Sequence, residues 1–206
     1  MSRPLYCLLV REGTSDDGLM SPLKALLIDL GFGADSQILP QPFAGSKRTA
    51  DVLQLIMDEG QTPDIVFVHR DADNDGYERR EMEVRRASDD VSPEFAVVPV
   101  VPVKMTEAWV LHALHNPQYQ AQLGISIPAK DLPARKTIPN IAAKDRLKQL
   151  HDAHFATRGR RKRKSDSRFT TDRSRWVEAL TDVRFLEGCE SFERLREEIL
   201  STQTGS

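Results

Sequence analysis

The feature that most constrains the fold of this chain is an apolar run that leads directly into a series of acids. Residues 65–68 read Ile-Val-Phe-Val, and Asp71, Asp73 and Asp75 follow at alternate positions before Gly76. A mostly β-branched run of this kind is typical of a strand buried on both faces inside a parallel sheet. Open α/β sheets bind their ligands at the carboxyl ends of such strands. Close carboxylates repel one another unless a cation lies between them, so the pattern predicts a divalent metal site there.

Strand and helix patterns alternate through the first half of the chain. Residues 5–10 and 95–102 are further apolar runs, and residues 38–39 predict a short peripheral strand because prolines follow them. Apolar residues at helical spacing and charged, helix-prone segments predict helices over residues 19–30, 49–59 and 77–87, with another beginning near residue 104. The alternation predicts an α/β fold: a parallel sheet of about four strands flanked by helices.

The pattern changes beyond about residue 115. Prolines punctuate a loop-rich connection, Asn140 is placed to cap a helix that runs to about His151, and shorter helices are expected over 173–181 and 191–200. We therefore expect two parts, which are an α/β core over residues 1–115 and a loop-rich, helical extension over residues 116–206 that packs on it.

Composition sets broad limits on function. The formal net charge is −2, with 39% apolar and 29% charged residues, which is typical of a soluble globular protein and argues against a general nucleic-acid coat. Neither a secretory signal nor an apolar segment of about 20 residues is present, so no membrane span is expected. The two cysteines lack the spacing of metal ligands, and Cys7 lies in an apolar run. Buried thiols in a reducing, cytoplasmic compartment are expected.

One local charge pattern stands apart from this balance. Six of the seven residues from 158 to 164 are cations, namely Arg158, Arg160, Arg161, Lys162, Arg163 and Lys164. The run is either a solvated loop or a surface that contacts a phosphate backbone without reading sequence. In the second case affinity for nucleic acid would fall steeply with salt.

Acids are expected to converge from three loops. Glu12 and Asp16 follow the first strand, Asp71 and Asp73 follow the central strand, and Glu107 follows the last clear strand. If these strands are parallel, their ends lie at one edge of the sheet. The five carboxylates then form a cage for Mg²⁺ or Mn²⁺, holding one ion or two ions about 4 Å apart.

The order of these motifs resembles the Toprim superfamily. The matching segments are Glu12-Gly13 with Asp16, then Asp71-Ala72-Asp73, and finally Glu107-Ala108-Trp109, and the likeness covers roughly residues 3–115. It is closest to the Toprim domains of OLD-family nucleases and to small stand-alone Toprim-like proteins of unassigned function. Two details differ, because Asp16 stands where many of those relatives have glutamate and Thr106 directly precedes Glu107.

The resemblance implies metal-dependent chemistry on nucleic-acid phosphodiesters, with hydrolysis favoured. Asp71, Asp73 and Glu12 would hold one ion, while Asp16 and Glu107 would help to hold a second. Glu12 is alternatively a general acid–base, and Lys104 would stabilise charge on the phosphate. Small proteins of this kind resemble partners of ATPases in bacterial anti-phage or repair systems. Since this chain has no P-loop, such an ATPase would be a separate chain.

Other interpretations of the same residues remain open. The run from Asp71 to Gly76 imitates the start of an EF-hand loop, but that loop needs an entering helix and a glutamate at its twelfth position, which here is Met82. A strand that ends in Asp-x-Asp also occurs in haloacid-dehalogenase-like phosphatases and nucleotide-sugar transferases. A purely structural role is also open for three of the acids, because carboxylates near the start of a helix complement its dipole. These acids are Glu12, Asp16 and Glu107. A non-catalytic adaptor that binds a partner protein through its C-terminal helices is the alternative function, and no oligomeric state is predicted.

Overall fold

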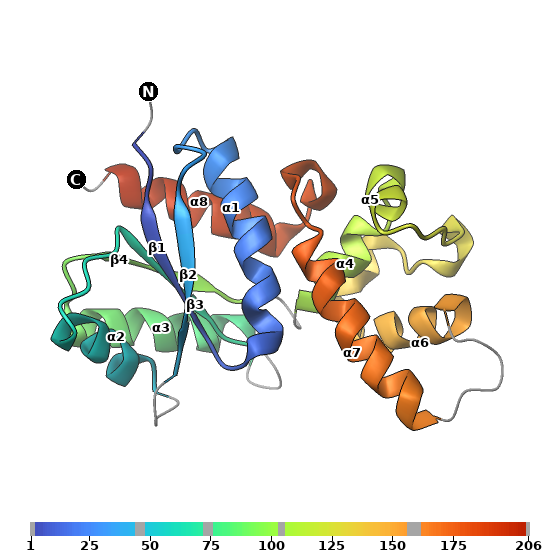
Figure 1. Ribbon diagram of the computed structural model, residues 1–206, viewed down its shortest axis with the longest axis horizontal. Helices are drawn as coiled ribbons and strands as arrows, with labels where there is room; N and C mark the ends of the chain where they lie inside the picture. The colour runs from blue at the N-terminus through green and yellow to red at the C-terminus, as the bar shows by residue number, and fades with distance from the viewer. Residues whose placement is uncertain (1–2, 44–47, 72–75, 103–105, 156–161, 205–206) are drawn as a thin grey trace.

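A parallel β-sheet organises the first half of the chain (Figure 1). The computed structural model describes residues 3–43, 48–71, 76–102, 106–155 and 162–204. Within them four strands lie side by side in the order β2-β1-β3-β4, and each neighbouring pair is parallel. Their bounds are β1 Tyr6–Arg11, β2 Gln37–Pro42, β3 Ile65–His69 and β4 Ala96–Val100. The predicted α/β fold, a four-stranded parallel sheet flanked by helices with a helical C-terminal extension, is confirmed.

The two inner strands are buried on both faces, as their apolar runs predict. Leu9 pairs in register with Phe67, and both belong to the cluster on one face of the sheet. Leu8 pairs with Val66, and both belong to the cluster on the other face. Because successive side chains of a strand point to opposite faces, one continuous apolar run supplies both clusters.

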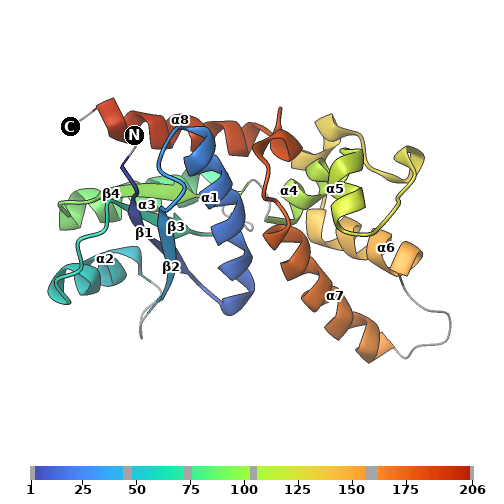
Figure 2. The same cartoon turned by 45° about the horizontal axis from the view of Figure 1, so that its top comes forward.

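Helices cover both faces of this sheet (Figure 2). Helices α1 (Met20–Asp29) and α8 (Glu190–Thr204) contribute buried residues to the cluster on the Leu9 face. Helices α2 (Thr49–Asp58) and α3 (Tyr77–Val91) contribute to the cluster on the Leu8 face. The last helix of the chain thus returns to pack against β4, far from it in sequence.

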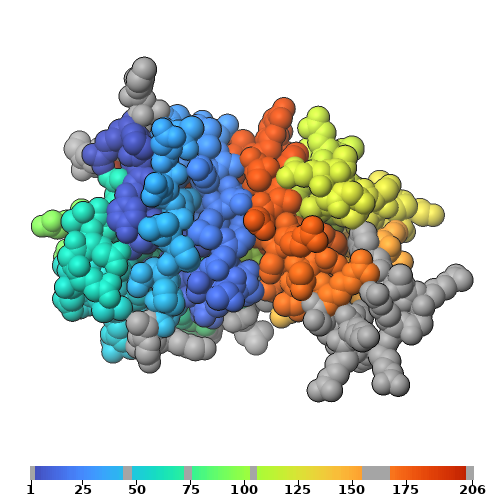
Figure 3. Space-filling view, viewed as in Figure 1, coloured from blue at the N-terminus to red at the C-terminus, as the bar shows by residue number. Residues whose placement is uncertain are grey.

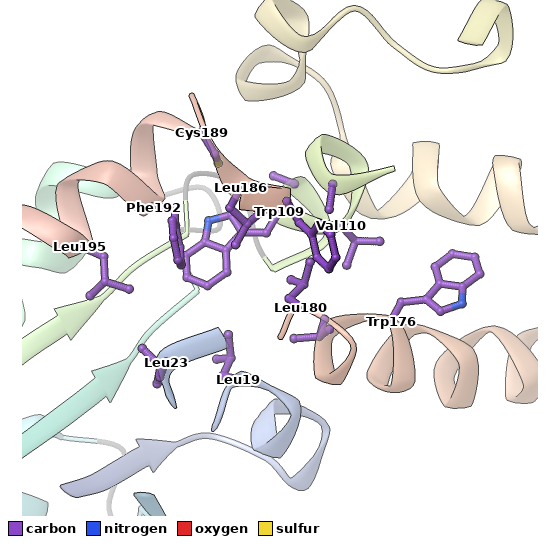
Figure 4. Close-up of a cluster of buried hydrophobic side chains, with 14 of the residues drawn as sticks. Leu19, Leu23, Trp109, Val110, Trp176, Leu180, Leu186, Cys189, Phe192 and Leu195 are labelled. Carbon is purple, nitrogen blue, oxygen red and sulfur yellow. The ribbon is translucent and has the colours of Figure 1, made fainter. Parts of the chain in front are cut away.

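The second half of the chain is helical and loop-rich. It contains α4 (Thr106–Ala113), α5 (Pro117–Gln122), α6 (Ala143–Phe155) and α7 (Lys162–Glu178), joined in part by the short 3₁₀ segments η2 (Ala129–Asp131), η3 (Arg135–Asn140) and η4 (Val183–Leu186). Its buried side chains continue the cluster on the Leu9 face of the sheet. Figure 4 shows Leu19 and Leu23 near Trp109, Leu180 and Phe192 within this continuous core. The space-filling view shows α7 lying against α1 on the front of the molecule (Figure 3).

Several predicted boundaries differ from the observed ones. Helix α7 begins at Lys162, so Lys162, Arg163 and Lys164 form its first turn and not part of a loop. Lysine and arginine favour helices, and a buried stripe that includes Phe169 and Trp176 anchors the helix farther along. Residues 158–161 of the basic run lie outside the described residues.

The predicted start of α6 at Asn140 is wrong, and α5 was not predicted. Asn140 ends η3, and α6 begins at Ala143. Helix α5 has clear start signals, because the Asn116 side chain accepts a hydrogen bond from the Gln118 N–H at 2.9 Å and Pro117 occupies the first helical position.

Two predictions about strands can be compared directly with the fold. Residues 65–69 form a strand, which removes the entering helix that an EF-hand requires. Pro99 lies in β4, which is an edge of the sheet, as expected for a residue that lacks an N–H donor. Among the residues described, no helix has both the length and the apolar character needed to cross a membrane.

Candidate functional site

The strand order creates a crevice at the carboxyl ends of β1 and β3. Chain order runs from β1 outward to β2 on one side, and then to β3 and β4 on the other side. The loops after β1 and β3 therefore leave in opposite directions, and ligands of open parallel sheets bind at such a reversal. The loop after β1 carries Glu12 and continues into the 3₁₀ segment η1 (Thr14–Leu19) with Asp16, and Asp71 follows β3.

The imidazole of His69 lies between two of the predicted carboxylates. Its Nδ1 atom is 3.6 Å from Oδ2 of Asp16, and its Nε2 atom is 3.6 Å from Oδ1 of Asp71. The His69 side chain is buried, whereas those of Asp16 and Asp71 are 15% and 29% exposed. Acids from two loops that are far apart in sequence thus meet on either side of one ring at the carboxyl end of the sheet.

Local hydrogen bonds fix the Asp16 carboxylate. The Gly13 N–H donates to Oδ2 at 3.2 Å, and the Ser15 hydroxyl donates to Oδ1 at 3.2 Å. Burial alone would raise the pKa of Asp16, but the imidazole of His69 and these two donors outweigh it and hold this pKa below its usual value. Asp16 is therefore a well-fixed carboxylate with a strong preference for the charged form.

The loop that carries Asp16 is held close to α7. A Cβ atom added to Gly18 would lie 3.0 Å from the Ser174 carbonyl oxygen and 3.3 Å from the Glu178 nitrogen. Any larger residue would require η1 or α7 to shift by a few tenths of an ångström. The helical extension thereby takes part in positioning an acid of the site.

Glu12 belongs to a second group of charges, on the other face of the sheet. Its Oε1 accepts from Nη1 of Arg70 at 3.0 Å, and Nη2 of Arg70 lies 3.0 Å from Oε1 of Glu83 on α3. Arg70 follows His69 and points to the opposite face, where its guanidinium lies over the Phe43 ring at 5.2 Å. The Glu12 side chain is 40% exposed, whereas that of Arg70 is 7% exposed.

Glu107 is paired with a cation from the helical extension. It is fully buried at the start of α4, and its Oε1 accepts from Nη1 of Arg173 on α7 at 2.8 Å. The Thr106 hydroxyl donates to its other oxygen at 3.5 Å. Glu107 therefore belongs to an ion pair that joins α4 to α7. This pairing indicates that Glu107 stabilises the packing of the two helices.

The predicted site residues thus fall into three groups. Asp16 and Asp71 each lie 3.6 Å from His69, Glu12 is paired with Arg70, and Glu107 is paired with Arg173. Asp73 and Lys104 lie outside the described residues, and so do Arg158, Arg160 and Arg161. Within the described parts of the chain, no three His, Cys, Asp or Glu side chains are grouped closely enough to hold a metal ion.

Asp16 and Asp71 nevertheless fit part of a hard-cation site. Their carboxylate oxygens are the ligands that Mg²⁺ and Mn²⁺ prefer, and both side chains are partly exposed at the crevice. Further ligands would come from Asp73 or water. The pairing of Glu107 with Arg173 gives no separate support to a second ion.

Sequence reasoning assigned no functional role to the residues that lie beside these acids. His69 and Arg70 directly follow a fully apolar run, and polar side chains at that position are a usable signal because they lie at the ligand-binding edge of the sheet. The sequence around Arg173 does not indicate its pairing with Glu107, because that pairing depends on how α7 packs against α4. No family model, curated protein or solved structure matches the chain.

Proposed function

We propose that the chain is a metal-dependent hydrolase of nucleic-acid phosphodiesters, with a Toprim-like core. The proposal rests on one observation above all, namely that Asp16 and Asp71 flank the same buried imidazole at 3.6 Å each, at the reversal point of a parallel sheet. This is the edge at which open α/β sheets bind ligands. It is also the edge at which the sequence pattern predicts Asp73.

The residues of the chain divide the proposed chemistry between them. Asp16, Asp71 and Asp73 are the proposed metal ligands, and the imidazole of His69 lies between the first two carboxylates. Glu12 was expected to act as a general acid–base, but it is paired with Arg70 on the other face of the sheet, so no role in this chemistry is assigned to it. Bound Mg²⁺ or Mn²⁺ would supply Lewis-acid stabilisation of the phosphate and lower the pKa of a bound water. Lys104 is proposed to counter charge on the same phosphate.

A cleavage assay with matched variants tests this proposal. Labelled single-stranded DNA, duplex DNA and single-stranded RNA are incubated with the protein in Mg²⁺, Mn²⁺ or EDTA. We expect metal-dependent cleavage by the wild type, and loss of cleavage to the EDTA background for Asp71→Asn. Asp35→Asn serves as the control, because Asp35 is an exposed acid just before β2, at the opposite end of the sheet.

The outcome is decisive only if the variants are folded, which near-ultraviolet circular dichroism and denaturation midpoints establish. Equal cleavage by wild type and Asp71→Asn would contradict the proposed site. The absence of cleavage in both metals on all three substrates would contradict a stand-alone hydrolase. It would leave activity that depends on a separate ATPase partner, which the same assay tests with ATP and the partner added.

A second function is favoured by the ion pairs at the site. Glu12 and Glu107 are each already paired with an arginine, which is what a fold that has lost its metal chemistry would show. In that case the chain is a non-catalytic adaptor that binds a partner protein through its C-terminal helices. The variant Asp71→Asn would then leave partner binding unchanged, whereas substitutions on the exposed face of α8 would weaken it.

A further inference from the structure

A basic cavity lies on the face of the sheet opposite the Asp16–His69–Asp71 group. Helices α2 and α3 lie side by side on this face (Figure 1), and between them is a cavity of about 540 Å³. Five arginines line it against two acids, and the lining charges are Arg48, Arg70, Arg79, Arg80, Arg86, Glu83 and Asp90. A cavity of this size accommodates a nucleotide-sized group.

Several of the lining arginines are paired with acids: Glu12 lies 3.0 Å from Arg70, and Asp51 lies 3.9 Å from Arg48. Glu83 accepts from both Arg70 and Arg80, at 3.0 Å and 2.7 Å. The Arg86 guanidinium forms no ion pair with any residue of the described ranges. Guanidinium groups match the geometry of phosphate oxygens through paired N–H donors. The guanidinium of Arg86 therefore favours an anionic ligand in the cavity.

A buried hydroxyl points to the same conclusion independently. Thr49 lines the cavity and is 2% exposed, yet its Oγ1 atom has no hydrogen-bond partner among the residues that the structure describes. A buried hydroxyl without a partner is costly, and so it marks a place where a ligand is expected to complete the hydrogen bond. Thr49 also begins the ten-residue helix α2, whose first N–H groups and positive dipole end favour an anion.

We propose that this cavity binds a backbone phosphate of the nucleic-acid strand that the acidic site would cleave, an inference that rests on the proposed function. Arg70, which lines the cavity, directly follows His69 at the end of β3, so the cavity and the acidic site lie on the two faces of the same carboxyl edge of the sheet. A strand with one phosphate in the cavity would pass Glu12 on its way to the crevice. The cavity thus acts as a subsite that positions the substrate.

Binding measured without metal tests this subsite separately from catalysis. Fluorescence anisotropy of a labelled single-stranded oligonucleotide in EDTA is compared for wild type, Arg86→Gln and Thr49→Val over a range of salt concentrations. We expect Arg86→Gln to weaken binding about tenfold and Thr49→Val about three- to tenfold, as for loss of one charged and one neutral hydrogen bond. Arg86→Gln should also reduce the log–log salt slope by about 0.7.

The neighbouring arginine provides a matched control. Arg85 lies beside Arg86 in sequence but faces the other way, where it pairs with Glu81 and Glu198 at 2.6 Å and 2.8 Å. Arg85→Gln removes the same charge and should leave oligonucleotide affinity unchanged. An equal loss for Arg85→Gln and Arg86→Gln would overturn the proposal, because the effect would then come from net charge alone.

Thr49→Val provides a readout that a purely structural role would not give. If the Thr49 hydroxyl forms its hydrogen bond only with a bound ligand, valine at this position should leave the urea denaturation midpoint unchanged or raise it. The affinity for the oligonucleotide should fall at the same time. A lowered midpoint with unchanged binding would overturn the proposal. Poly-glutamate as competitor separates phosphate from carboxylate ligands, and displacement of the oligonucleotide at equal charge concentration would overturn it in favour of an acidic peptide.

The two proposals fail in different ways. Loss of binding in Arg86→Gln and Thr49→Val but not in Arg85→Gln would support the phosphate subsite even if no cleavage is found with any metal. Metal-dependent cleavage that needs Asp71 while both cavity variants bind normally would support the acidic site and overturn the subsite.

Discussion

Removing the positive partner of the buried Glu107 should destabilise the whole fold. Glu107 is 0% exposed, and its Oε1 atom lies 2.8 Å from Nη1 of Arg173, whose side chain is 14% exposed. Leucine in place of Arg173 leaves a carboxylate in the core without a charge partner. Breaking a buried pair in this way costs about 3–5 kcal/mol. That is a large fraction of the roughly 5–15 kcal/mol by which most domains are stable.

A double-mutant cycle separates the pair from the packing around it. With Glu107→Gln present as well, no charge is left uncompensated, so the double variant should regain most of the lost stability. The coupling energy between the two sites should be about 2 kcal/mol or more. Arg173→Lys, which retains the charge, should lose less than Arg173→Leu and provides a measurable variant if leucine prevents folding.

Tryptophan fluorescence in a urea titration is well suited to this measurement. Trp109 lies in α4 and Trp176 in α7, so the two buried fluorophores belong to the same two helices that the ion pair joins. A change below about 0.5 kcal/mol for Arg173→Leu, the level of ordinary surface substitutions, would refute the assigned role of the pair. Additive effects in the cycle would refute the coupling.

Three further outcomes follow from the same structure. Gly18→Ala should cost about 1–3 kcal/mol in urea unfolding, because its Cβ would press on the α7 backbone, and an unchanged midpoint would show that η1 and α7 are not in close contact. Burial raises the pKa of Cys7 to about 12 and also raises that of Cys189, so neither thiol should react with a disulfide reagent at pH 8 until the protein unfolds; rapid native reaction of either thiol would contradict their burial. The lowered pKa of Asp16 stabilises the fold at neutral pH and this contribution is lost as pH falls through the folded-state value, so acidification from pH 5 to 3 should destabilise wild type more than Asp16→Asn, and equal losses would argue against it.

The sheet was predictable because its signals are local. The apolar runs of β1 and β3 are each continuous, and burial on both faces needs no information from elsewhere in the chain. Parallel strands end at one edge, so the placement of Asp16 and Asp71 at the same end of the sheet, each 3.6 Å from His69, follows from topology. The edge position of the proline-containing strand was predictable as well, because proline lacks the N–H donor that an inner strand needs.

The partners of the acids were not predictable in the same way. Glu107 and Arg173 are 66 positions apart, and their pairing depends on how α7 crosses α4. Arg70 and Glu12 point to the face of the sheet opposite His69, a consequence of alternation that becomes visible only when the strand bounds are known. Helix α7 was placed too short because its first turns carry charges and little apolar pattern.

A manganese soak of crystals, read by anomalous scattering, tests the central claim most directly. Wild-type protein should show an anomalous peak at this crevice, at about 2.0–2.2 Å from a carboxylate oxygen of Asp71 as for a Mg²⁺-type ion. The same soak of Asp71→Asn should lose the peak, while Asp35→Asn should retain it. No peak at this crevice in the wild type, or one that persists in Asp71→Asn, would contradict the account.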